Sequence, residues 1–319
     1  MSGAGPSQGT DSAAAHAAGM QDQSGYRGRF APSPTGPLHF GSLVAAMASY
    51  ADARAARGQW LLRIEDVDEP RTRAGAADAI LAALERLGFE WDGEVWRQSA
   101  RRDAYDAALA QLAAQGLVYR CACTRRELAT AMLGPIGERV YPGTCRGGLA
   151  GVRALRRRAS LRVRVPLAPV EFVDRLHGAN EQRLAEAIGD FIVRRSDGFF
   201  AYQLAVVVDD AAQQITDVVR GADLLASTPR QIFLQRALGL PTPRYMHVPV
   251  AVDASEAKLS KAAGAAALPA AALPALRAAW RFLGQAAPRD PHSSVREFWS
   301  WAIASWQPAR LPPVTMRRV

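Results

Sequence analysis

A predicted strand, a proline-rich loop and a predicted helix follow one another at residues 29–58, and this order constrains the fold most. A short apolar run ends at Ala31, and three prolines and a glycine then exclude regular structure. From Gly41 apolar residues recur at helical spacing, and we expect Gly58 to end the helix. Backbone N–H groups at such a helix start can hold a phosphate, and His39 can donate to the same anion. An ordinary strand-to-helix turn with a surface histidine has the same pattern.

The lysines are the next informative feature. Of 39 basic residues 37 are arginine, and the two lysines, Lys258 and Lys261, stand within four residues. A lysine ammonium is compact and mobile, whereas the arginine fork is planar and rigid. The pattern indicates that an ammonium is required in the segment Lys258-Leu259-Ser260-Lys261.

Charge and composition favour an enzyme with a polyanionic partner. The net charge is +9, and residues 1–25 contribute two acids and no base, so residues 26–319 carry +11. An arginine-rich genome would produce a similar surplus without such a partner. Residues 1–25 are predicted to be a disordered tail, because they have no apolar periodicity and lack the basic start and apolar centre of a signal peptide. No apolar run is long enough for a membrane span, so we expect a cytoplasmic protein with no membrane association.

The three cysteines lie close together in the sequence, at Cys121, Cys123 and Cys145. An odd number of cysteines in a cytoplasmic chain argues against a disulfide framework. Three thiolates near glycine and proline suit zinc, which takes four ligands in a tetrahedron. No histidine lies nearby, so Tyr141 or a water is left to complete the site. Buried free thiols are the alternative.

Several acids and arginines stand at the ends of apolar runs. Residues 60–64 are predicted to form a buried strand that leads directly to Glu65, and residues 215–223 a second strand that delivers Arg220. The run 200–210 is a buried strand or helix that ends in paired acids. Amphipathic helices are expected at 74–87 and 101–115, and one that starts at Thr228-Pro229 with Thr228 as its N-cap. The arginine-rich segment 153–164 is either a phosphate-contacting edge or a solvated surface.

Leu38-His39-Phe40-Gly41 resembles the nucleotide-binding signature of class I aminoacyl-tRNA synthetases, in the form used by the glutamate and glutamine enzymes. Ser42 stands where many class I enzymes carry a second histidine, and glutamate enzymes commonly have a small hydroxyl residue there. Lys258-Leu259-Ser260-Lys261 resembles the second class I signature, a mobile loop whose lysine neutralises ATP phosphates. The resemblance implies catalytic roles for His39 and Lys261 and Mg²⁺ carried by ATP. It implies ATP contacts by His39, Gly41, Ser42, Lys258, Ser260 and Lys261.

The same resemblance implies a glutamate pocket. Glu65 would meet the substrate's α-ammonium, and Arg29 and Arg220 would take its carboxylates bidentately. The full set of glutamate-binding residues would be Arg29, Phe30, Ala31, Pro32, Ser33, Glu65, Tyr202 and Arg220.

The cysteine pattern is similar to that of a truncated branch of the family, which carries a structural zinc on Cys-x-Cys, Tyr and Cys. By this resemblance the zinc ligands are Cys121, Cys123, Tyr141 and Cys145. Members of this branch activate glutamate without tRNA and transfer it to queuosine at the wobble position of tRNA(Asp). The alternatives are ordinary charging of a tRNA 3′ end and an inactive RNA-binding paralogue.

The expected fold is α/β: a class I Rossmann-type parallel sheet with a zinc-bearing insertion and a short helical C-terminal region. In that last region we expect one helix near 275–284 and another that opens at Ser294, with Glu297 completing a capping box. We expect a monomer without an anticodon-binding domain. The predicted divisions are a tail at 1–25, the two halves of the catalytic domain at 26–120 and 201–262, the insertion at 121–200 and the helical region at 263–319.

Overall fold

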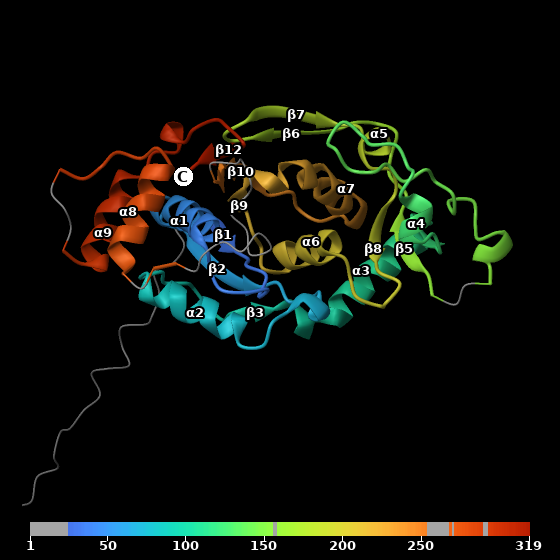
Figure 1. The fold of residues 1–319 in the computed structure, drawn as a ribbon, viewed down its shortest axis with the longest axis horizontal. Helices are drawn as coiled ribbons and strands as arrows, with labels where there is room; N and C mark the ends of the chain where they lie inside the picture. Colours follow the sequence, from blue (N-terminus) through green and yellow to red (C-terminus); the bar gives the residue numbers. More distant parts are fainter. Residues whose placement is uncertain (1–24, 156–157, 254–267, 270, 290–292) are drawn as a thin grey trace, which may run out of the picture.

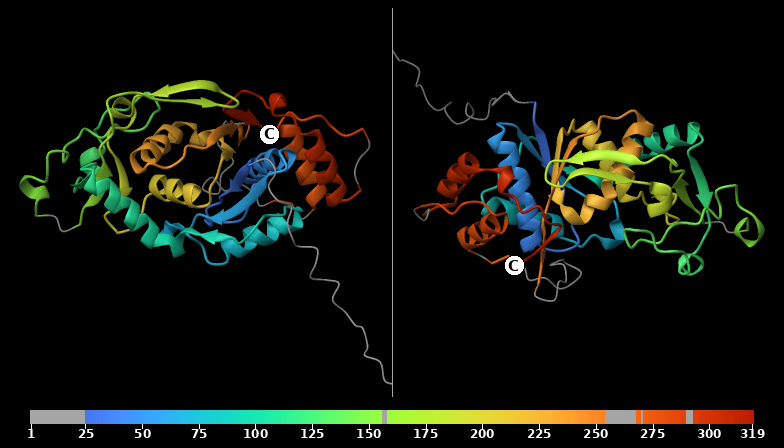
Figure 2. Two further views of the ribbon diagram at one scale, coloured as in Figure 1. Left: turned by 180° about the vertical axis from the view of Figure 1, so that it is seen from behind. Right: turned by 90° about the horizontal axis from the view of Figure 1, so that it is seen from above.

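The computed structural model describes residues 25–155, 158–253, 268–269, 271–289 and 293–319. Residues 1–24 of the predicted tail and the lysine segment with Lys258, Ser260 and Lys261 lie outside these described residues. Within the described ranges no helix has both the length and the apolar character needed to cross a bilayer. The molecule is elongated, with the C-terminal helices at one end and a small antiparallel sheet at the other (Figures 1 and 2).

The first part of the chain forms a parallel sheet in the order β1-β2-β3. A long helix follows β1, in agreement with the predicted order of strand, loop and helix. One amphipathic helix follows β2 and another follows β3. The elements are β1 (Arg27–Phe30), α1 (Phe40–Ala55), β2 (Gln59–Ile64), α2 (Ala76–Arg86), β3 (Trp96–Arg97) and α3 (Arg102–Ala114).

A second sheet has the order β7-β6-β10-β9, in which β6, β10 and β9 are parallel and β7 is antiparallel. The apolar run 200–210, predicted as either strand or helix, is mostly helix. The elements are β6 (Val170–Asp174), β7 (Gly178–Gln182), α6 (Tyr202–Ala212), β9 (Asp217–Gly221), α7 (Thr228–Leu238) and β10 (Arg244–Val248).

The two sheets meet edge to edge at β1 and β9. The backbone N–H of Thr216 donates to the carbonyl of Arg27 (2.9 Å), and the Arg27 N–H donates to the Thr216 hydroxyl (2.8 Å). The combined strand order is therefore β3-β2-β1-β9-β10-β6, and the direction of winding reverses between β1 and β9. In parallel α/β sheets ligands bind at such a reversal, outside the carboxyl ends of the strands. The predicted parallel α/β architecture is confirmed.

A smaller antiparallel sheet, β4-β5-β8, carries the cysteines at the far end of the molecule (Figure 1). Its small core contains Tyr119, Cys121, Tyr141 and Cys145. We call residues 118–165 the cysteine module. The module contains β4 (Val118–Cys121), α4 (Arg125–Leu128) and β5 (Ser160–Val163). Later in the chain α5 (Leu184–Ala187) and β8 (Phe191–Arg194) follow, and β8 completes the sheet.

The C-terminal region packs against the first sheet through aromatic side chains. Trp299 lies 4.7 Å from Tyr50 and 4.9 Å from Phe89 between ring centroids, and its indole N–H donates to the Leu87 carbonyl (2.8 Å). β12 pairs in parallel with β11, the strand that leads into the lysine segment. The elements are β11 (Val250–Val252), α8 (Ala272–Phe282), α9 (Val295–Ser305) and β12 (Met316–Arg318). Short 3₁₀ turns occupy Glu69–Arg71, Gln98–Arg101, Gly151–Arg153, Ala222–Ser227 and Pro308–Arg310.

Two predicted helix ends are wrong in detail. The left-handed residue after α1 is Arg57 (φ 57°) rather than Gly58. Gly58 is required instead by close packing, because a Cβ there would lie 2.4 Å from the Tyr26 carbonyl oxygen. Thr228 is the first residue of α7 rather than its N-cap, which is Ser227. The Thr228 hydroxyl contacts buried polar groups that are described below.

The predicted cap at Ser294 is confirmed, since its side chain accepts a hydrogen bond from the Glu297 N–H. The Glu297 carboxylate accepts from the N–H and hydroxyl of Ser293, one residue before the cap. The predicted domain boundaries stay predictions.

Candidate active site and cysteine cluster

A cavity of about 750 Å³ opens at the carboxyl ends of β1, β2 and β9, at the reversal of the winding direction. All eight residues predicted to bind glutamate line it, together with three of the predicted nucleotide contacts, His39, Gly41 and Ser42. The structure therefore brings these eleven residues together in one cavity. Their individual roles stay predictions.

One side of the cavity is the start of α1. His39 is the N-cap of this helix, and its Nδ1 accepts a hydrogen bond from the Ser42 N–H (3.3 Å). An accepting Nδ1 carries no proton, so the proton of a neutral ring is on Nε2. Gly41 and Ser42 lie in the first helical turn, where backbone N–H groups favour an anion. This side of the cavity can hold a phosphate.

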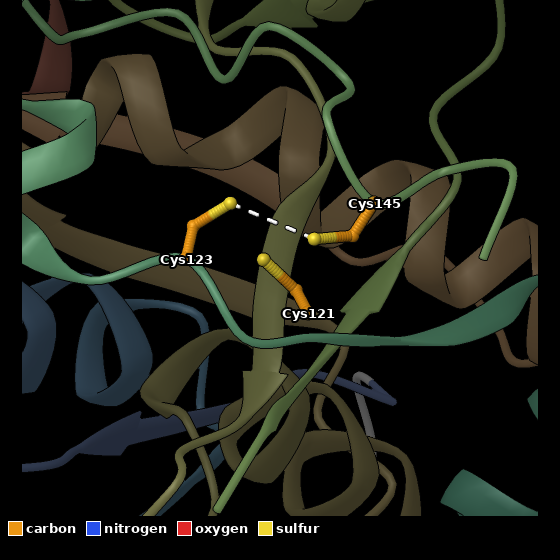
Figure 3. A group of neighbouring side chains, drawn as sticks. All are labelled: Cys121, Cys123 and Cys145. Carbon is orange, nitrogen blue, oxygen red and sulfur yellow. Dashed lines mark hydrogen bonds between the residues drawn. The ribbon is translucent and has the colours of Figure 1, made fainter. Parts of the chain in front are cut away.

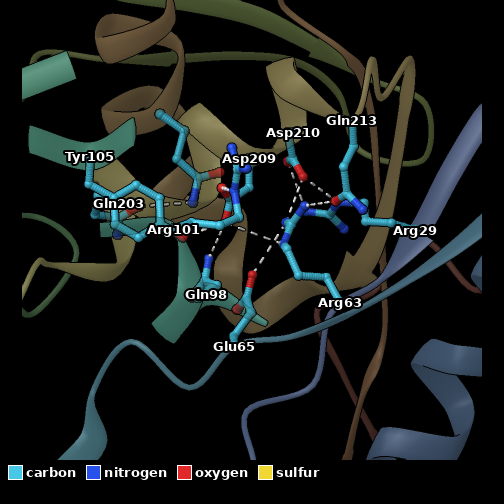
Figure 4. A network of polar contacts seen from close by, with 11 residues as sticks. Arg29, Arg63, Glu65, Gln98, Arg101, Tyr105, Gln203, Asp209, Asp210 and Gln213 are labelled. Atoms are coloured by element: carbon cyan, nitrogen blue, oxygen red, sulfur yellow. Dashed lines mark hydrogen bonds and ion pairs between the residues drawn. The ribbon is translucent and has the colours of Figure 1, made fainter. Parts of the chain in front are cut away.

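A buried network of charged groups forms another wall (Figure 4). Asp210, on α6, accepts hydrogen bonds from Arg29 Nε (3.1 Å) and Nη2 (3.2 Å) and from Arg63 Nη2 (2.7 Å). Arg63 is 0% exposed and also contacts Glu65 (3.4 Å) and Gln213 (2.5 Å). Burial alone would raise the pKa of Asp210, but the two arginines lower it below the usual value. Asp210 therefore stays ionised and fixes both guanidinium groups.

The neighbouring acid, Asp209, holds a further set of groups, and its Oδ2 also lies 3.9 Å from Arg63 Nε (Figure 4). It is 0% exposed and accepts hydrogen bonds from Gln98 (3.0 Å), Arg101 (2.6 Å) and Tyr105 (2.7 Å). The paired acids at the end of the apolar run are thus both buried. They link the second part of the chain to the first.

Glu65 follows β2 and faces the cavity beside this network. Its backbone N–H donates to the Pro32 carbonyl (3.0 Å), which explains the position of Pro32 in the wall. Burial raises the pKa of Glu65 to about 7, although Arg63 and Arg29 act to lower it. A carboxylate in this condition gains from a cationic ligand, because the ligand replaces the lost solvation.

Arg220, on β9, also lines the cavity. Its Nε donates to His247 Nε2 (3.0 Å) and its Nη2 to the Thr228 hydroxyl (2.8 Å). Its Nη1 is buried and has no hydrogen-bond partner among the described residues. In Arg29 and in Arg220 alike, protein partners occupy Nε. Nη2 has a protein partner in both arginines too, and the expected bidentate binding of carboxylates by Arg29 and Arg220 stays a prediction.

Tyr202 lies among these charges at the start of α6. Burial and the nearby Glu65 raise its pKa to about 12, while Arg220 and Arg29 act to lower it. The phenol therefore remains protonated and can donate a hydrogen bond. Two cationic contacts, one anionic contact and one phenol together fit a dicarboxylate that carries an ammonium group.

The three cysteines converge in the small module, as predicted (Figure 3). Their sulfurs all lie within 4.8 Å of one another, and Cys123 Sγ is 3.6 Å from Cys145 Sγ. Tetrahedral zinc, with Zn–S bonds of about 2.3 Å, separates its sulfurs by about 3.8 Å. Tyr141 Oη lies 3.3 Å from Cys121 Sγ and 4.0 Å from Cys123 Sγ, next to the sulfurs. The cluster could hold a metal ion.

The surroundings of the thiols favour one thiolate. Burial would raise the pKa of Cys121, but contacts with Tyr141, the Cys123 backbone and Arg162 lower it to about 7. Burial and the neighbouring sulfurs raise the pKa of Cys123 to about 11. Three ionised thiolates would repel one another here, and a bound cation would offset that repulsion. The Arg162 guanidinium stacks on the Tyr141 ring at 3.8 Å and supplies part of that charge.

The sequence did not reveal two groups of supporting residues. Arg63 stands inside an apolar strand, where a buried charge requires a partner. No sequence pattern near Arg63 showed that this partner would be Asp210. His247 and Asp174 stand behind Arg220, and His247 was one histidine in an apolar run with no pattern around it. A charged or ionisable residue inside an apolar strand was the available signal in both cases.

Comparison with known proteins extends this picture. Residues 26–270 match the family described as tRNA synthetases class I (E and Q), catalytic domain. A protein of Aromatoleum aromaticum named glutamyl-Q tRNA(Asp) synthetase is 57% identical over 291 residues, which cover 90% of each chain. One of the same name from Burkholderia mallei is 58% identical over 296 residues, 90% of this chain and 98% of the relative.

The fold has a counterpart among solved structures. The crystal structure of a glutamate-tRNA synthetase from Elizabethkingia anophelis superimposes with a TM-score of 0.74 at 25% identity. The superposition covers 92% of this chain and 68% of that one.

Proposed function

From its membership of the class I tRNA synthetases for glutamate and glutamine, a family of ligases, we propose that the chain activates glutamate with ATP in the absence of tRNA. We propose further that it transfers the activated glutamate to queuosine at the wobble position of tRNA(Asp). The queuosine acceptor is supported by the name of relatives that are 57–58% identical to this chain. Location in the cytoplasm and a monomeric state stay predictions.

In the first step a carboxylate oxygen of glutamate attacks the α-phosphorus of ATP. The bond to the bridging oxygen breaks, pyrophosphate leaves with the electron pair, and glutamyl-adenylate remains. Because two anions must approach each other, positive groups that follow the developing charge are the main requirement. His39 Nε2–H, the Gly41 N–H and the Ser42 hydroxyl contact the nucleotide. Lys258, Ser260 and Lys261, outside the described residues, complete this set, with Lys261 catalytic.

The observation that carries the proposal is the presence of two arginines and Glu65 in the lining of one cavity. Arg29 and Arg220 bind the two carboxylates, and Glu65 binds the α-ammonium. Tyr202, Ser33 and the chain at Phe30, Ala31 and Pro32 form the rest of the surface. Mg²⁺ that arrives with ATP offsets phosphate charge.

In the second step a hydroxyl of the queuosine cyclopentenediol attacks the glutamyl carbonyl carbon. The carbonyl–phosphate bond breaks, AMP leaves, and the hydroxyl proton is released. An ester links glutamate to the modified nucleoside. No nucleophilic side chain takes part in this scheme.

We further propose that Cys121, Cys123, Cys145 and Tyr141 hold one structural zinc. The spacing of the sulfurs and the position of the phenol support this set. Zinc supplies the cohesion that thiolates cannot provide for one another.

The test is transfer of labelled glutamate onto tRNA(Asp) with and without queuosine, followed by nuclease mapping of the label. We expect label only on queuosine-containing tRNA, in the anticodon-loop fragment, and glutamate-dependent pyrophosphate exchange without tRNA. Label at the 3′ end would instead support ordinary charging, which the likeness to a glutamate-tRNA synthetase keeps as the second candidate. Failure to activate glutamate under either condition would leave only an RNA-binding role.

A further inference from the structure

A row of buried polar side chains lies directly behind Arg220. It crosses three neighbouring strands: Asp174 ends β6, His247 lies on β10 and Arg220 on β9, with Arg220 and His247 opposite each other in the strand register. Thr228, at the start of α7, closes the row. Asp174 is 1% exposed and Arg220 5%, whereas His247 and Thr228 are 0% exposed. Polar groups buried this deeply need an explanation beyond packing.

Each hydrogen bond in the row has one possible direction. A guanidinium can only donate, so Arg220 Nε donates to His247 Nε2 (3.0 Å) and that nitrogen carries no proton. The ring proton is therefore on Nδ1, which donates to Asp174 Oδ2 (2.7 Å). Asp174 Oδ1 accepts the backbone N–H groups of Leu176 (2.9 Å) and His177 (3.0 Å). The carboxylate fixes the ring, and the ring fixes the guanidinium.

The partners of Arg220 leave its charge available. Thr228 is a neutral hydroxyl, and burial lowers the pKa of His247 to about 4 even though Asp174 acts to raise it. By contrast Arg29 is ion-paired with Asp210, which offsets its charge. The Arg220 fork also faces the Tyr245 ring at 5.3 Å, so its plane is restrained, and the unpartnered Nη1 belongs to a residue that lines the cavity.

We propose that His247, held by Asp174, is a positioning residue that sets the orientation of Arg220 and thereby the cavity's selection of glutamate over the shorter aspartate. This inference rests on the proposed glutamate-binding role of Arg220. A neutral acceptor on Nε keeps the fork in place without reducing its charge. With the fork fixed, the distance from Arg220 to Arg29 and Glu65 is fixed too, and aspartate, which lacks one methylene, cannot reach all three groups at once.

The test compares His247→Leu, which removes the acceptor, with His247→Gln, whose amide oxygen can still accept from Arg220 Nε. In pyrophosphate exchange we expect His247→Leu to raise the KM for glutamate at least tenfold, leave the KM for ATP unchanged and reduce the preference for glutamate over aspartate. His247→Gln should restore most of both losses. The matched control is His177→Leu, which should leave the three quantities unchanged, because among the described residues the His177 ring meets the backbone carbonyl of His247 (2.9 Å) and not its side chain.

A wild-type KM and wild-type discrimination in folded His247→Leu would overturn the proposal. So would a lowered kcat with unchanged KM that His247→Gln does not rescue, since that pattern reports a purely structural role. If His247→Leu does not fold, Asp174→Asn provides the test. The single amide oxygen of asparagine cannot accept hydrogen bonds from both the His247 ring N–H and the two backbone N–H groups. The same rise in KM is then expected, and a wild-type KM would refute the idea. Absence of glutamate activation by the wild-type protein would refute the proposed function instead, so the two failures are distinguishable.

Discussion

Arg63, in the wall of the cavity, is fully buried and contacts two acids within 3.4 Å, whereas Arg125 and Arg126, beside the cysteines, are exposed and have no ion-pair partner in the described ranges. The contrast is one of degree, since the ion pairs Arg153–Glu127 (3.0 Å) and Arg146–Asp190 (3.2 Å) also hold arginines of the cysteine module. Around the cavity, protein groups orient the charged side chains. The cysteine module has eleven arginines against two glutamates and a small core built around three thiols.

The difference suggests two sources of order. The cavity keeps its shape through charge pairs within the chain, so it needs no ligand to hold its walls. The module gathers three thiols in one place and has exposed arginines such as Arg125 and Arg126 without an ion-pair partner in the described ranges, so bound ligands of opposite charge would add to its order. A metal ion suits the first group and a polyanion the second.

The largest effect should come from Arg63→Met, which leaves Asp210 and Glu65 buried next to a neutral side chain. Removing one partner of a buried ion pair costs about 3–5 kcal/mol of the free energy of unfolding. Urea denaturation measures the change. Arg97→Met is the control, since Arg97 pairs with Asp78 across 3.4 Å at the exposed surface and should cost no more than about 1 kcal/mol. Equal losses in the two variants would contradict the contrast drawn above.

Next in size is Cys123→Ser, which should reduce bound zinc from one per chain and lower the stability of the cysteine module. Metal analysis and amide exchange measure the two quantities together. Tyr141→Phe should have a smaller effect on zinc binding. If the phenol only orients the thiolates, zinc should bind about 10–100-fold more weakly, and if the phenol is a ligand the loss should be greater. Full metal loss with unchanged exchange in the module would show that zinc has no structural role there.

The third prediction concerns pH and Glu65. Its pKa of about 7 means that the ammonium-binding carboxylate form dominates above pH 8 and is about one-tenth populated at pH 6. The KM for glutamate in pyrophosphate exchange should therefore rise about tenfold from pH 8 to pH 6. The charged groups that face Glu65 are Arg63, Arg29, Asp210 and Asp209. Glu65→Gln should bind glutamate weakly at both pH values, and a pH-independent wild-type KM would argue against this role.

The smallest effect is expected from the exposed arginines of the module. Arg125→Gln should weaken binding of tRNA only a few-fold and reduce the slope of log K against log salt by about 0.9, the value for one phosphate contact on a duplex. Binding measured from low to moderate salt gives the slope. Arg86→Gln, an exposed arginine at the end of α2, is the matched control and should leave it unchanged. Identical slopes for both variants would remove the module from the RNA-binding surface.

Local patterns predicted the parts of the site that are close in sequence. The strand, loop and helix at 29–58 and the three cysteines could be located because each motif lies within about thirty residues. The sequence could not show that Asp210 would meet Arg63, because that contact depends on which strands become neighbours. The same applies to Asp174 and His247, which are 73 positions apart. An apolar run reveals that a segment is buried, but not what a polar residue inside it will meet.

The seam between β1 and β9 has a consequence for how the protein is made. Arg29 and Arg63 find their shared partner Asp210 at separations of 181 and 147 residues, and Arg27 meets Thr216 at 189. Contacts of such high sequence separation form slowly, because a long chain must be closed before they yield any gain. During synthesis the first strands leave the ribosome with two arginines destined for the interior and no acid to receive them. Glutamate binding should accordingly be among the last properties that a newly made or refolding chain acquires, well after its helical circular dichroism.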